Sequence, residues 1–151
     1  MGQQQLLLLV LGIVIVGLAV VVGIQAFGEN QKKANADALV NDGVRIASDA
    51  QAWALKPTAF GGGNGAFTGV AFQDLGYTLG GGTGCTAAQY GNLNGCFTIA
   101  ITTAATSSTP GEVTITGQSA ANDNQVVVVV DGTGPEDITT DIGPIPSTTS
   151  N

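Results

Sequence analysis

Histidine is absent from this 151-residue chain, and only four basic residues are present. Without histidine, the usual ligand sets for zinc and haem are incomplete, and a cysteine nucleophile has no histidine base. No serine lies beside another plausible base, and no pair of carboxylates stands in apolar surroundings. We therefore expect no enzymatic activity, no metal site and no cofactor.

Basic residues are missing altogether from the second part of the chain. Lys32, Lys33, Arg45 and Lys56 are balanced by four acidic residues between positions 25 and 56. From Pro57 onward there are seven acidic residues and no basic one, so this part carries the whole net charge of −7. Binding to a phosphate backbone is then electrostatically disfavoured, and we expect no nucleic acid partner.

Cysteine is also scarce, with two residues in the chain. Cys85 and Cys96 stand among glycine, threonine and asparagine. In a loop-rich exported domain such a pair is most simply a disulfide, which contributes about 2–3 kcal/mol for so short a loop. Two free buried thiols are the alternative.

One long hydrophobic run lies near the N-terminus. Residues Leu6 to Ile24 are nineteen consecutive apolar residues, and the first charged residue is Glu29. As a helix this run is about 28 Å long at about 1.5 Å per residue, close to the thickness of a bilayer core. It is too long for the core of a secretory signal, so we predict a membrane-embedded helix.

The pattern becomes amphipathic after Gly28 and continues to about Leu55, before Pro57 stops the helix. We predict one long helix with two halves, the second of which packs on a sheet, with Ile46 and Trp53 adding bulk. The apolar positions of the second half recur at helical spacing and are mostly small: Ala36, Leu39, Val40, Gly43, Ala47, Ala50 and Ala54. The opposite stripe is polar: Lys33, Asp37, Asn41, Arg45 and Asp49.

The segment from Thr58 to Gly95 is rich in glycine and is predicted to be a long irregular connector. Its first glycine cluster, residues 61–65, lacks the following Lys-Ser/Thr of a phosphate-binding loop. A short strand or an apolar plug against the helix is expected from four residues between the clusters: Phe67, Val70, Phe72 and Leu75.

The last part of the chain has β character. Alternating or β-branched residues predict three antiparallel strands, around residues 97–102, 113–116 and 126–130. Polar turns are expected at residues 107–111 and 117–124, and the tail from Asp131 to Asn151 is expected to lie extended over the surface or along another subunit. The predicted fold class is α+β, organised as residues 1–28, 29–56 and 57–151.

This combination resembles a type IV pilin: a charge-free apolar N-terminal helix, an amphipathic continuation, a glycine-rich loop, a small antiparallel sheet and a disulfide in the C-terminal half. The resemblance implies a subunit held in the membrane before assembly and then packed with identical copies into an extracellular filament. It also implies an assembly machinery and a prepilin peptidase as partners. Adhesion and motility are roles implied by the family alone.

The resemblance places the core of such a filament in the apolar run, where glycine permits close approach of helices. The expected packing residues are Leu6, Leu7, Leu8, Val10, Leu11, Gly12, Ile13, Val14, Gly17, Leu18, Val20, Val21, Gly23 and Ile24.

Two positions depart from the family pattern. Members usually carry glutamate as the fifth mature residue and often proline near position 22, where this chain has Gln5 and Val22. If Met1 is the mature N-terminus, we expect Met1 and Gln5 to set the registry with a neighbour by a neutral hydrogen bond. Cleavage before Gln3 would instead make Leu7 the fifth residue, and both possibilities stay open.

Other functions fit the sequence less well. A single-pass anchored extracellular domain or a pseudopilin-like secretion component is the main alternative to a filament subunit. An adhesin or receptor head is a further class. Asp131, Glu136 and Asp137 could offer oxygen ligands to calcium, but they lack the full loop pattern, and a surface turn is the better interpretation.

Overall fold

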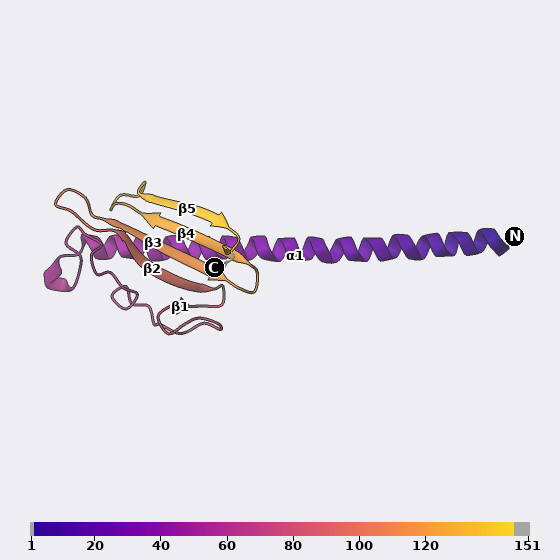
Figure 1. The fold of residues 1–151 in the computed structure, drawn as a ribbon, viewed down its shortest axis with the longest axis horizontal. Coiled ribbons are helices and arrows are strands. Elements are labelled where there is room, and N and C mark those ends of the chain that lie inside the picture. The colour runs from indigo at the N-terminus through magenta and orange to yellow at the C-terminus, as the bar shows by residue number, and fades with distance from the viewer. Residues whose placement is uncertain (1, 147–151) are drawn as a thin grey trace, which may run out of the picture. The chain divides into compact units, whose positions relative to one another are not determined.

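The computed structural model describes residues 2–146 and contains one long helix and one antiparallel sheet (Figure 1). Helix α1 runs without interruption from Gly2 to Leu55, as predicted. The chain divides into two units, Met1–Ala34 and Asn35–Asn151, so the second stretch of the helix belongs to the same unit as the sheet. This second unit, a helix packed on a sheet, confirms the α+β class.

The end of α1 is tied down by a compact turn. Pro57 precedes a 3-10 helix, η1, at Thr58–Phe60. The carbonyl of Trp53 accepts hydrogen bonds from the backbone N–H groups of Lys56 and Gly63, at 3.1 and 3.0 Å. These bonds satisfy carbonyls that a helix end leaves without partners, and they fix the turn to the helix.

Five strands form one sheet in the order β1-β2-β3-β4-β5, with every neighbouring pair antiparallel. Their bounds are β1 Tyr90–Gly91, β2 Cys96–Thr103, β3 Glu112–Ser119, β4 Asn124–Val130 and β5 Ile138–Gly143. The three predicted strands are β2, β3 and β4. Because consecutive strands are neighbours throughout, the sheet is a simple meander, and its inner face packs on α1.

We call the second unit, which begins at Asn35, the head. Its core lies between the inner face of the sheet and the stretch of α1 from Asn35 to Leu55. Alternate residues of β3 and β4 are fully buried, as the period of two requires. On the helix, an added Cβ at Gly43 would stand 2.9 Å from Cγ2 of Val128. The small-residue stripe predicted from the sequence therefore lets the helix lie close against β4. The core members are Leu39, Ile46, Ala47, Ala50, Ala54, Phe67, Val70, Phe72, Phe97, Val113, Ile115, Val126, Val128 and Val130.

The sheet is larger than predicted at both edges. The short strand β1 precedes β2, and β5 forms within the tail that was expected only to lie extended. The predicted turn at residues 117–124 was also too long, because β3 continues to Ser119 and Gly117 pairs with Val126. Glycine is needed there for space, since a Cβ at Gly117 would be 2.6 Å from the ring of Phe97.

The glycine-rich connector contributes an apolar plug, the second of the two predicted possibilities. Phe67, Val70 and Phe72 are buried in turns outside the strands and belong to the core. The backbone N–H of Phe67 donates to the carbonyl of Pro110, at 2.9 Å, which joins the connector to the loop before β3. The connector is therefore irregular in backbone but fixed in place.

Candidate functional site

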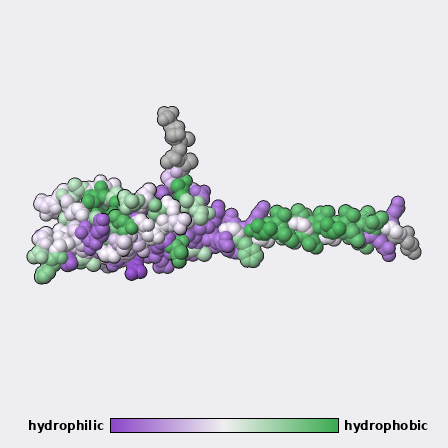
Figure 2. Space-filling model, turned by 90° about the horizontal axis from the view of Figure 1, so that it is seen from below, coloured by the Kyte–Doolittle hydropathy of each residue, from purple (hydrophilic) through white to green (hydrophobic). Residues whose placement is uncertain are grey.

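The largest uncovered surface in the described chain is the apolar run of α1 (Figure 2). Every large aliphatic side chain from Leu6 to Ile24 is at least half exposed, and Phe27 is 75% exposed. This helix is long and apolar enough to cross a membrane. A surface of this kind needs a partner, either hydrocarbon or protein.

The predicted packing residues all lie on this exposed run. None of Gly12, Gly17 and Gly23 is needed by the subunit itself, because an added Cβ at each would meet nothing within 4 Å. Gly12 and Gly23 are about three turns apart and so share a face of the helix, with Ala19 between them, whereas Gly17 lies on another face. Small residues on one face of an apolar helix permit close approach of a second helix.

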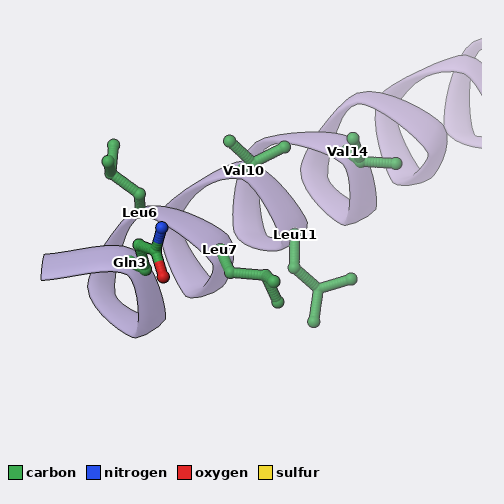
Figure 3. A pocket seen from close by; sticks show the side chains of 6 residues that line it. All are labelled: Gln3, Leu6, Leu7, Val10, Leu11 and Val14. Carbon is green, nitrogen blue, oxygen red and sulfur yellow. The ribbon is translucent and has the colours of Figure 1, made fainter. Parts of the chain in front are cut away.

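A hollow of about 650 Å³ lies on the same run (Figure 3). Its walls are two rows of side chains spaced four residues apart, and no second element closes it: Gln3, Leu7 and Leu11 in one row, and Leu6, Val10 and Val14 in the other. Such rows are the ridges by which helices interlock. The hollow has the form of a groove for one ridge of a neighbouring helix.

Polar groups stand at the beginning of the run. Gln3 and Gln5 lie in the first turns of α1 and are exposed. The amide of Gln3 makes no hydrogen bond within the described residues. Met1, the other residue expected to set registry, lies outside the described residues. The predicted pairing at this end involves a second copy, so a single chain does not test it.

In the head, a network of amides and one carboxylate joins the loop before β2 to the helix. The side-chain amides of Asn92 and Asn94 donate to Asp42 Oδ2, at 2.8 and 2.7 Å. Asn35 Nδ2 donates to the backbone carbonyl of Asn94, at 2.9 Å. This network was not predicted from the sequence, since the residues that it joins are 50 or more positions apart and no local pattern marks them.

A second polar contact holds the loop between β4 and β5. Gln51, buried on the helix, donates to the carbonyls of Gly132 and Gly134, at 2.9 and 2.7 Å. In the loop itself, Asp137 Oδ2 accepts the N–H of Gly134, at 2.7 Å. Asp137 thus closes a turn, and the described residues contain no group of three metal-ligating side chains.

Among the titratable side chains of the described residues, Tyr77 has a pKa that its environment clearly shifts. Its hydroxyl donates to Asp49 Oδ2, at 2.5 Å. Burial, then the hydrogen bond and the negative charge of Asp49, raise the pKa of Tyr77 well above its usual range. Tyr77 also contacts Tyr90, with ring centroids 4.7 Å apart. The hydrogen bond from Tyr77 to Asp49 therefore fixes the connector to α1.

Cys85 and Cys96 form a disulfide, as predicted, with Cα atoms 5.4 Å apart. It links the glycine-rich connector to the first residue of β2. The chain is tightly folded here, because a Cβ at Gly82 or Gly91 would be 2.6 Å from the sulfur of Cys85. The disulfide therefore fixes the second glycine cluster of the connector, residues 80–84, to the sheet.

Comparisons with protein-family models, with curated proteins and with solved structures found no match to this chain.

Proposed function

We propose that this chain is the structural subunit of an extracellular, type IV pilus-like helical filament, assembled by packing of its apolar N-terminal helix. The single observation that carries the proposal is the charge-free run Leu6 to Ile24, whose large aliphatic side chains are all exposed, whereas the last stretch of the same helix, from Asn35 to Leu55, packs on the sheet. One helix then serves two partners: its own head and something outside the chain.

The exposed surface is too large to remain in water. Between Leu6 and Ile24, fifteen large aliphatic side chains are at least half exposed. Burial of a whole side chain of this type contributes about 1.5–3 kcal/mol, so burying half of this surface contributes on the order of 15 kcal/mol. That is comparable to the entire stability of a typical domain. Lipid before assembly and neighbouring copies afterwards both supply this burial.

Two features favour neighbouring helices as the final environment. The glycines at positions 12, 17 and 23 have no role inside the subunit, yet they provide close approach for other helices. The groove lies between two rows of side chains spaced four residues apart, the kind of surface on which a second helix packs, and no other described element of the chain covers it. Lipid chains require neither feature.

Gln3 and Gln5 supply registry in this proposal. A side-chain amide at the edge of an apolar seam gains a hydrogen bond only when a neighbour presents its own polar group at the same level. Copies aligned through such amides have one preferred axial position. The prepilin peptidase and the assembly machinery enter as partners through the resemblance to type IV pilins.

The alternative is a single-pass anchored domain or a pseudopilin-like secretion component. The apolar run is about 28 Å long as a helix, which is close to the hydrocarbon thickness of a bilayer. This length favours the membrane-anchored alternative. The two functions differ in where the run finally lies: against copies of itself, or in lipid.

Electron microscopy of material sheared from cells expressing this chain, with mass spectrometry of its N-terminal peptide, separates them. Thin helical filaments containing the chain support the filament subunit and identify the mature N-terminus as Met1 or Gln3. Complete retention in the membrane fraction, with no filaments, supports the anchored domain.

A further inference from the structure

The head has an uncharged hollow of about 590 Å³ between the loop before β2 and the connection between β3 and β4. None of the described residues that line it is charged, although the unit is strongly acidic. Its walls include Asn94, Gln118 and Ser119, together with the aliphatic side chains of Leu93 and Ile145. Leu93 is fully exposed at its edge. An apolar side chain could therefore contact Leu93 and Ile145 in the hollow without approaching a charged lining residue.

The hollow is located at the Asn35 end of the head. Asn35 Nδ2 donates to the carbonyl of Asn94, which lines the hollow. Asn35 Oδ1 accepts from Asn124 Nδ2, directly after the β3–β4 connection. The disulfide and the Asp42 network hold the loop on the other side. These contacts make the hollow a fixed feature of the fold.

The opposite end of the head presents two exposed apolar side chains. Leu55 is 62% exposed and Phe60 is 72% exposed. We call these two residues the apolar knob. The turn that carries it is fixed to the helix, since Gly65 N–H donates to the carbonyl of Ala54, at 2.6 Å, and Asn64 N–H to that of Lys56, at 2.9 Å. A rigid turn loses little entropy when it binds.

Knob and hollow are too far apart to meet within one chain. Twenty helical residues separate Asn35 from Leu55, which is about 30 Å. Figure 1 shows the turn after α1 and the β3–β4 connection at opposite ends of the head. Any contact between them must join two copies. Because the two surfaces differ, that contact is heterologous, and it gives a closed ring or an open helix according to the rotation between copies. The open helix is the form that a filament requires.

We propose that the apolar knob of one copy inserts into the hollow of the next, which makes a second assembly contact in addition to the helix core. This inference rests on the proposed filament function and extends it to the heads. The charges agree with it. The knob end carries Lys56 beside Leu55, and also Glu112, Asp131 and Glu136 where β3 begins and β4 ends, so the acidic residues outnumber the basic one. Stacking this end on another acidic surface would be repulsive, and the uncharged lining of the hollow reduces that repulsion.

Paired cysteines test the contact in assembled filaments of the full chain. We expect the double variant Phe60→Cys with Ala121→Cys, whose second site lines the hollow, to give a ladder of covalent multimers on oxidation. Each single variant gives at most dimers. The matched control pairs Phe60→Cys with Ile142→Cys, an exposed apolar position on β5, and gives no ladder. Filaments of the Phe60→Cys/Ala121→Cys variant without a ladder would overturn the proposal.

A second pair of variants covers failure of the cysteine variant to assemble. Phe60→Glu places a charge in the contact and lowers the yield of sheared filaments at least tenfold, whereas Ile142→Glu does not. Adding Ala121→Lys to Phe60→Glu restores the yield by an ion pair across the contact. Unchanged yield for Phe60→Glu, or no restoration by Ala121→Lys, would exclude this pairing while filaments of the unmodified chain persist. Absence of filaments from the unmodified chain would instead refute the proposed function.

Discussion

Replacing Gly17 by valine distinguishes effects on the folding and membrane insertion of the subunit from effects on filament assembly. In the single chain the new side chain meets no atom within 4 Å at its Cβ. Glycine is about 1 kcal/mol less favourable than alanine inside a helix, and valine is intermediate, so the substitution stabilises α1 slightly. It also adds apolar surface, which favours membrane insertion. The subunit should therefore accumulate in the membrane at its normal level.

Assembly is affected in the opposite direction. If Gly17 contacts a neighbouring helix, the added isopropyl group overpacks that contact, and overpacking typically costs about 1–3 kcal/mol. This corresponds to roughly a 5- to 150-fold weaker association, because about 1.4 kcal/mol is a factor of ten. The assay compares sheared filament yield with the amount of subunit in the membrane fraction. Val20→Leu, which adds bulk at a position that is already large, is the control.

The expected result is a several-fold or greater loss of filaments from Gly17→Val, with unchanged membrane content. Normal filament yield from this variant would refute the reasoning, because it would show that close approach at Gly17 is not used. Reduced membrane content would show that the valine acts on insertion or folding.

Two further predictions concern the head. Reducing the Cys85–Cys96 disulfide should lower the stability of the head by about 2–3 kcal/mol and increase its protease sensitivity, while preformed filaments stay intact. Unchanged cleavage under reductant would contradict this role. The raised pKa of Tyr77 predicts loss of stability in alkali: its contribution is complete below the ordinary tyrosine value of about 10 and decreases as pH rises toward the folded value. Alkaline unfolding curves should show this loss in the unmodified protein and less of it in Tyr77→Phe, and equal curves would rule it out.

The sequence predicted those features of the fold that depend on local patterns. The apolar run and the small-residue stripe identified α1, because helical spacing places Gly43 and Ala47 on one face. The alternation of apolar and polar residues identified β2 and β3, and the β-branched run Val126–Val130 identified β4. The disulfide followed from composition and spacing. In each case one chemical pattern corresponds to one structure.

Features that depend on distant partners were not predictable in this way. Strand β5 was missed because it is short, mostly exposed and close to prolines, and it is ordered by pairing with β4. Gly117 was assigned to a turn, whereas it makes space for Phe97 inside the sheet. The bonds from Asn92 and Asn94 to Asp42 join residues that only the complete fold brings together.

Part of the candidate assembly surface could be predicted from the sequence and part could not. Its location in the run from Leu6 to Ile24 follows from composition alone. The groove beside Gln3 requires coordinates, since it depends on which side chains form neighbouring rows. The apolar knob and the hollow were not predicted, because exposure of Phe60 and Leu93 cannot be inferred from residue type.

Cryo-electron microscopy of filaments sheared from cells expressing this chain would test whether α1 mediates assembly. We predict a filament core built of α1, with residues 6–24 of each copy buried against the same residues of its neighbours. A preparation in which the chain stays in the membrane fraction without filaments, or filaments whose core lacks this segment, would contradict it.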